Sequence, residues 1–133
     1  MQLRILLIES DAAMLDTLQQ ALAGRGYEVD VVPDGLIGLA ELERNATPPD
    51  LILLRVEIPR MSGYTVCNKI KRREKLRGIP LILFSSQATP ETFAQHKRLR
   101  TRADGYLSVP IDDGELLSLV DDLTRGKALS GSF

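Results

Sequence analysis

The chain has very few of the side chains that form covalent cross-links and metal centres. Its 133 residues include one cysteine, Cys67, one histidine, His96, and no tryptophan. A single cysteine excludes an intramolecular disulfide and a cysteine zinc cluster, and a single histidine excludes a multi-histidine metal site. Low cysteine content is typical of a reducing cytosol, so we expect a cytoplasmic protein.

Long apolar runs and targeting signals are also lacking. No stretch approaches the roughly 20 apolar residues that a membrane-spanning helix needs, so we expect no membrane insertion. The first residues, MQLRILLIES, include an acid by position 9 and no small-residue cleavage site, which is not the pattern of a signal peptide. With 44% hydrophobic and 26% charged residues, the composition is that of one ordinary globular domain.

The net charge of −1 is close to zero, but the two signs are unevenly distributed. Residues 1–50 hold 3 basic and 9 acidic side chains, residues 51–102 hold 12 and 3, and residues 103–133 hold 2 and 6. Either separate solvated helices carry different signs, or the basic middle third forms a surface for an acidic partner.

Short β-rich segments alternate with amphipathic stretches along the chain. We expect strands at 3–8, 27–32, 50–56, 81–84 and 105–108, and helices at 12–23, 35–45, 64–74, 90–101 and 113–124. The alternation predicts an α/β, flavodoxin-like doubly wound sheet of five parallel strands in the order 2-1-3-4-5, as a single domain over residues 1–124. Residues 125–133 show no periodicity and predict a tail or linker.

In open α/β sheets, sites form beyond the carboxyl ends of the strands, where the strand order reverses. Four polar segments follow the first, third, fourth and fifth predicted strands. They are Glu9-Ser10-Asp11, Arg55-Val56-Glu57, Ser85-Ser86 and Ser108-Val109-Pro110. We expect these segments to meet at one edge of the sheet.

Four stretches resemble bacterial response-regulator receiver domains over about residues 3–124. They are RILLIESD, PDLILLRVEIPRMSGY, IPLILFSS and ADGYLSVPID. The resemblance implies that active members bind Mg²⁺ with two acids after the first strand and accept a phosphoryl group on an aspartate after the third. A Thr or Ser after the fourth strand and a Lys after the fifth then contact that group. The matching positions here are Glu9, Ser10, Arg55, Ser85 and Val109.

Arg55, at the acceptor position, is the most consequential difference. A guanidinium is always protonated and has no carboxylate oxygen, so it cannot form an acyl phosphate. Mg²⁺ prefers carboxylate ligands, and an added cation opposes it, so we expect no Mg²⁺ and no other cofactor. We predict an ion pair between Arg55 and Glu9, shared with Asp11 or Glu57. The alternative is an Arg55 side chain that extends into solvent.

The resemblance also implies that Ser85 and Tyr106 match residues that move on phosphorylation in active receivers. Ser85 can instead satisfy a strand end by local hydrogen bonding, and Tyr106 can pack as a half-buried aromatic with a polar tip. The segment FAQHKRLRTRADGYL is similar to the degenerate receiver-like domain of FrzS-type gliding-motility signalling proteins. This implies that His96 and Tyr106 act in signalling as partner contacts. The alternative for His96 is a partly exposed helix histidine.

If the fourth helix packs beside the fifth strand, the rings of His96 and Tyr106 meet. Two basic clusters also fall in the middle third. They are Lys69, Lys71, Arg72, Arg73, Lys75 and Arg77, and then Lys97, Arg98, Arg100 and Arg102. Merged into one face, they favour an acidic protein partner. Nucleic acid is not expected, because no aromatic residues interleave and no helix-turn-helix is present.

These observations predict a non-phosphorylatable receiver-like domain that is not an enzyme. It is expected to act as a protein–protein interaction module in bacterial signal transduction, with motility as one candidate pathway. Its output would depend on a preformed face around the fourth helix, fifth strand and last helix. Two alternatives stay open: a phosphotransfer domain that uses Ser10 or Asp11 as an atypical acceptor, and a small-molecule sensor that uses the vacated pocket.

Overall fold

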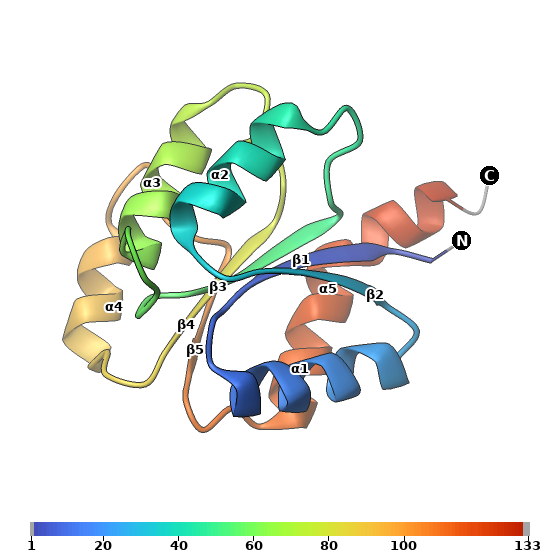
Figure 1. Cartoon of the computed structure of the whole chain (residues 1–133), viewed down its shortest axis with the longest axis horizontal. Coiled ribbons are helices and arrows are strands. Elements are labelled where there is room, and N and C mark those ends of the chain that lie inside the picture. The colour runs from blue at the N-terminus through green and yellow to red at the C-terminus, as the bar shows by residue number, and fades with distance from the viewer. Residues whose placement is uncertain (1, 132–133) are drawn as a thin grey trace.

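Five strands and five helices alternate along the chain (Figure 1). The computed structural model describes residues 2–131, with side chains described up to residue 126. The strands are β1 Arg4–Ile8, β2 Glu28–Val32, β3 Leu51–Arg55, β4 Leu81–Ser85 and β5 Gly105–Ser108. The helices are α1 Ala12–Gly24, α2 Gly35–Arg44, α3 Gly63–Arg72, α4 Pro90–Lys97 and α5 Asp113–Gly131.

All five strands are parallel and lie in the order β2-β1-β3-β4-β5, which confirms the predicted sheet. Helices α2, α3 and α4 cover one face, and α1 and α5 cover the other (Figure 1). Strands β1 and β3 are neighbours, yet α1 follows β1 on one face and α3 follows β3 on the other. The chain therefore leaves these two strands in opposite directions, which opens the carboxyl edge for a site.

The central strands alternate their side chains between two apolar layers. In β1, Ile5 and Leu7 join the layer under α1 and α5, and Leu6 and Ile8 join the layer under α2 and α3. Strands β3 and β4 repeat this alternation. A strand covered on both faces needs apolar residues at every position, which explains the continuous apolar runs. Within residues 2–131, no helix combines the length and hydropathy needed to cross a bilayer.

Carboxylates that follow strands or turns begin three of the helices. Asp11 Oδ2 accepts the N–H of Met14 at 2.9 Å, and Asp34 Oδ1 accepts the N–H of Ile37 at 2.9 Å. Asp112 does the same at the start of α5. Each cap satisfies an N–H that has no partner inside its helix. The carboxylates of Asp11 and Asp34 are therefore engaged at the starts of α1 and α2.

Two helix ends were predicted wrongly. Helix α4 ends at Lys97 rather than at residue 101, because Leu99 N–H turns back to the His96 carbonyl and the Thr101 hydroxyl bonds Asn68 on α3. This tertiary contact overrides the helical spacing. Helix α5 runs to Gly131 rather than to residue 124, because no proline interrupts the chain there. The other boundaries agree with the prediction to within two residues.

Gly63 provides a test of the backbone contact that places α3 beside the end of β3. A Cβ at Gly63 would lie 2.3 Å from the Arg55 carbonyl oxygen and 2.8 Å from Val56 Cα, and backbone atoms cannot turn aside. We expect Gly63→Ala to lower the free energy of unfolding in urea by at least about 2 kcal/mol. The control is Gly24→Ala, where nothing lies within 4 Å. Equal stabilities of the two variants would contradict this account.

Candidate functional site

Arg55, the last residue of β3, joins the ends of three strands. Its Nη1 donates to Glu9 Oε2 at 2.9 Å, its Nε donates to Glu57 Oε1 at 3.3 Å, and its Nη2 donates to Ser86 Oγ at 3.0 Å. The Arg55 side chain is 14% exposed, and the Glu9 side chain is 1% exposed. The predicted Arg55–Glu9 ion pair is therefore present, and the alternative of an Arg55 side chain extended into solvent is wrong.

Glu9 is held by donors at both of its carboxylate oxygens. Oε1 accepts the backbone N–H groups of Ser10 at 2.8 Å and Asp11 at 2.9 Å, and Oε2 accepts Arg55. A buried carboxylate is tolerated only when it is paired and hydrogen-bonded, and these contacts meet both conditions. Because the Asp11 carboxylate caps α1, it does not share Arg55. Glu57, rather than Asp11, therefore shares Arg55 with Glu9.

Glu57 extends the network to β4. Its Oε2 accepts the Ser85 hydroxyl in a short hydrogen bond, and its Oε1 accepts the Ser86 N–H at 3.1 Å. Burial alone would raise the pKa of Glu57, yet this pKa is lowered, because Ser85, Ser86 and Arg55 all stabilise the charged form. Ser85 Oγ also accepts the N–H groups of residues 87 and 88, so the expected local bonding at the strand end is present too.

The carboxylate oxygens of Glu9 and Glu57 already have protein hydrogen-bond partners. Mg²⁺ needs oxygens that are free to face it, but both Glu9 oxygens already accept N–H groups, and the Arg55 guanidinium lies between Glu9 and Glu57. Burial alone would lower the pKa of Arg55, but Glu9 and Glu57 outweigh this and raise it, so the cation persists. Across the described residues, no group of three or more His, Cys, Asp or Glu side chains is placed to hold a metal ion.

Two predicted pocket residues contribute no side-chain charge to this network. Ser10 is exposed and supplies its backbone N–H to Glu9. Val109 packs against the apolar layer under α1 and α5, and its N–H donates to the Ser85 carbonyl at 2.9 Å. Glu9, Glu57 and Arg55 together carry one net negative charge. The hydroxyl and N–H donors on β4 and in the loop after it offset that charge.

A second polar cluster surrounds His96, whose side chain lies beneath α4. The residue is 5% exposed. Its Nδ1 lies 2.6 Å from Tyr106 Oη, and its Nε2 lies 2.9 Å from Asn68 Oδ1, which also accepts the Thr101 hydroxyl at 2.7 Å. An amide oxygen only accepts, so Nε2 carries the proton and Nδ1 accepts from Tyr106. Burial lowers the pKa of His96, which favours this neutral form.

Aromatic rings enclose His96. The His96 and Tyr106 centroids are 5.7 Å apart, so the predicted meeting of these rings between α4 and β5 is confirmed. Tyr64 lies 5.0 Å from His96 and Phe93 lies 5.1 Å from Tyr106, by centroid. The alternative of a partly exposed helix histidine is wrong, because these neighbours bury the imidazole. A partner would meet His96 only in the floor of a hollow beside α4.

Two residues of the His96 network, Asn68 and Thr101, were not predicted, and neither was the contact between Ser86 and Arg55. Asn68 lies four residues after Tyr64 on α3, so the shared helix face was a usable signal. Thr101 lies where helix was predicted, and nothing in its spacing indicated a turn. Ser86 directly follows Ser85, but its contact with Arg55 depends on the Arg55 rotamer.

The predicted surface residues Lys97, Arg98 and Arg100 are all exposed. Lys97 Nζ lies 5.2 Å from the Tyr106 ring centroid, a cation–π contact that also covers this ring. The first basic cluster is divided: Arg72 and Arg77 line the same hollow as Arg100, and Lys75 faces a different hollow beside Leu76. The predicted merging of the two clusters therefore holds for part of the first.

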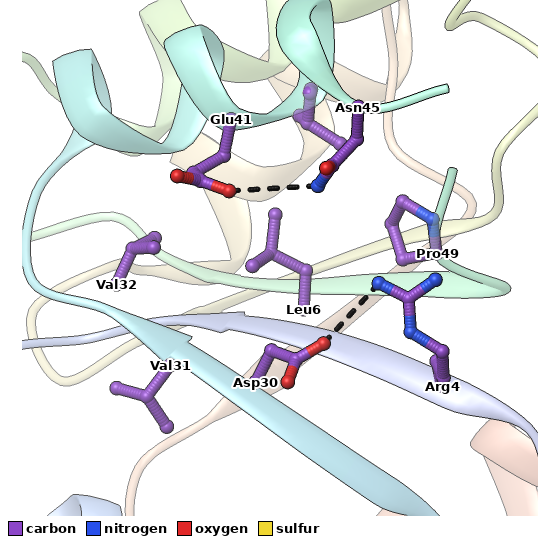
Figure 2. A pocket seen from close by; sticks show the side chains of 9 residues that line it. Arg4, Leu6, Asp30, Val31, Val32, Glu41, Asn45 and Pro49 are labelled. Atoms are coloured by element: carbon purple, nitrogen blue, oxygen red, sulfur yellow. Dashed lines mark hydrogen bonds and ion pairs between the residues drawn. The ribbon is translucent and has the colours of Figure 1, made fainter. Parts of the chain in front are cut away.

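Another hollow lies between β2 and α2, toward the start of β1 (Figure 2). Its volume is about 360 Å³. Arg4 pairs with Asp30 at 3.3 Å, and on the α2 side the Asn45 amide donates to Glu41 at 3.5 Å (Figure 2). Because its charged groups satisfy one another, this hollow offers less to a charged ligand than the edge around Arg55.

Replacing Arg55 by methionine tests whether the Arg55 charge offsets the charge of the buried Glu9 carboxylate. The variant keeps an apolar stem but leaves a carboxylate that is 1% exposed without its cation, so we expect a loss of about 3–5 kcal/mol in urea unfolding at neutral pH. Adding Glu9→Gln should recover much of that loss. The control is Arg44→Met, whose partner Glu41 is more accessible, with an expected change below about 1 kcal/mol. Similar small losses for both arginines would refute this role.

Because His96 is buried, we expect the free energy of unfolding to fall in mild acid. The folded-state pKa lies below the value of about 6.5 for an unfolded chain, so the unfolded chain binds the proton first. Stability should be level above about pH 7 and decline as the pH falls below about 6.5. His96 is the only histidine, so His96→Gln should flatten urea-unfolding stabilities between about pH 5.5 and 7.5. An unchanged slope in this variant would contradict the assignment.

The chain is similar in sequence to parts of known signalling proteins. The chain is 33% identical over 119 residues to Adventurous-gliding motility protein Z of Myxococcus xanthus (strain DK1622), covering 90% of this chain and 8% of that protein. It is 37% identical over 127 residues to Response regulator PleD of Caulobacter vibrioides (strain NA1000 / CB15N), covering 96% and 27%. The chain thus spans less than a third of these curated relatives.

A solved structure and a family profile also match this chain. The signal receiver domain of a signal transduction histidine kinase from Syntrophus aciditrophicus superposes with a TM-score of 0.82 at 31% identity, over 92% of this chain and 90% of that one. Residues 5–121 match the profile described as the response regulator receiver domain. The chain belongs to the response regulator receiver domain family.

Proposed function

We propose that this receiver domain signals without phosphorylation at the end of β3 and acts as a protein–protein interaction module. The observation that carries the proposal is the guanidinium of Arg55 bound between Glu9 and Glu57. Receiver domains are in general non-enzymatic signalling modules, and we propose no catalytic activity for this one. The similarity to a gliding-motility protein makes motility the pathway that we favour.

The contacts at this edge support the absence of phosphoryl chemistry. Arg55 offers no oxygen to a phosphoryl donor, and its charge opposes Mg²⁺. The Ser85 hydroxyl already donates to Glu57, so it is not free to contact an incoming group. Val109 supplies no cation at the position where the family resemblance implies a lysine. We therefore propose that neither Mg²⁺ nor a phosphoryl group is needed for signalling.

The same contacts support a face that is formed in advance. Glu57 and Arg55 tie β1, β3 and β4 together, and His96 holds α4 to β5 through Tyr106 and to α3 through Asn68. With both networks satisfied, the exposed side of α4 and β5 has a fixed geometry. We propose that Lys97, Arg98 and Arg100 contact the partner on this side, and that His96 and Tyr106 position the surface beneath them.

Treatment with acetyl phosphate and Mg²⁺ followed by intact-mass measurement tests the proposal. We expect the mass of the natural chain to stay unchanged. A gain of about 80 Da, located by fragmentation at Ser10 or Asp11, would favour an atypical acceptor and contradict our proposal. The positive control is the triple variant Ser10→Asp, Arg55→Asp, Val109→Lys, which restores the residue types that the family resemblance implies. This variant should gain the phosphoryl mass under the same treatment.

A further inference from the structure

Two neighbouring hollows lie beside α3 and α4, away from the Arg55 network. One hollow of about 350 Å³ is lined by Tyr64, Asn68, Thr92, Gln95, His96 and Leu99. A second hollow of about 560 Å³ is lined by Lys71, Arg72, Arg77, Leu99, Arg100 and Thr101. Leu99 lines both hollows, and we call the two hollows together the α3–α4 groove.

The first half of the α3–α4 groove is apolar and aromatic. Leu99 is 43% exposed, and it is one of few large apolar side chains this accessible among the described residues. The Tyr64 ring packs on His96 beside it. This half offers an apolar contact to an occupant.

The second half is cationic. Arg72, Arg77 and Arg100 are exposed, and within the part of the chain that the structure describes none of them forms an ion pair. Lys71 differs, because its amine is bound by Asp104 at 2.8 Å and by the Ile79 carbonyl at 3.0 Å. The three guanidiniums thus face one hollow without a counter-charge, and their planar forks suit carboxylates.

We infer that the α3–α4 groove binds an acidic protein segment that carries an apolar residue. The apolar side chain packs against Leu99 and the Tyr64 ring, and carboxylates on the same segment pair with Arg72, Arg77 and Arg100. The inference rests on the proposed interaction role and adds the chemistry of the partner and the place where it binds. The surplus of basic residues over positions 51–102 would also speed the approach of an acidic partner.

A protein segment fits this groove better than a nucleic acid does. Binding of successive bases needs several open aromatic faces, but Tyr64 and the buried His96 are the only described lining residues with aromatic rings, and Phe93 is buried against Tyr106. The cations also line only one half of the groove, whereas a phosphate backbone would require them along its whole length. A peptide that combines apolar and acidic side chains matches both halves.

The inference is tested by an NMR titration of the complete chain with acetyl-EELDELEE-amide. We expect saturable amide shifts concentrated at residues 64–72 and 95–101. Two matched peptides serve as controls, one with leucines replaced by serine and one with acids replaced by their amides. Each control should bind at least about 10-fold more weakly, because each removes the complement to one half of the groove.

Variants of the chain separate a specific site from general charge attraction. Arg72→Glu/Arg100→Glu should weaken binding at least about 10-fold, and so should Leu99→Ser. The control Arg44→Glu/Arg125→Glu makes the same change in net charge on α2 and α5 and should stay within about 2-fold of the natural chain. Thermal unfolding of each variant verifies that it is folded.

Several results would overturn the inference. Shifts centred on α1 or α5, or equal losses in both double variants, would show that the groove is not the site. Tighter binding of an RNA oligonucleotide at the same residues would make it a nucleic-acid surface. Self-association that Arg72→Glu/Arg100→Glu abolishes would identify a second copy as the occupant. The phosphorylation test is independent: a chain that binds the peptide and also gains phosphoryl mass contradicts only the proposed function.

Discussion

The ion pair between Arg55 and Glu9 governs the carboxyl edge of the sheet. Glu9 is almost completely buried, so its charge requires a partner, and β3 supplies one from the neighbouring strand end. Once the guanidinium is fixed there, its remaining donors orient Glu57 and Ser86, and Glu57 takes the hydroxyl of Ser85. The edges of β1, β3 and β4 are thereby held by a closed set of charged groups, with each carboxylate facing a donor.

The hydrogen-bond network around His96 is made of neutral groups. His96 is buried without an acid beside it, so its imidazole is satisfied by a hydroxyl and an amide instead. Through Asn68 it reaches α3, and through Tyr106 it reaches β5, so one ring fixes the distances among three elements. The charged network holds the ends of β1, β3 and β4, and the neutral network holds α4 to α3 and β5.

The sequence was sufficient for the order of the elements and for the Arg55–Glu9 pair. Both follow from topology, because alternating apolar runs specify a parallel sheet and opposite charges then end adjacent strands. The burial of His96 did not follow, because its partner Asn68 comes from a distant segment and its cover depends on how α4 packs. The turn at Thr101 was not predicted for the same reason. The Asn68 side chain on α3, rather than local propensity, ends α4.

His96 lies in the floor of the α3–α4 groove and is bonded to Tyr106 on β5. Any two ligands that both favour one position of this imidazole, one in the groove and one on the β5 side, are thermodynamically linked. Each then changes the affinity of the other by the same factor, whichever binds first. A single buried ring thus connects the α3–α4 groove to β5 through one hydrogen bond.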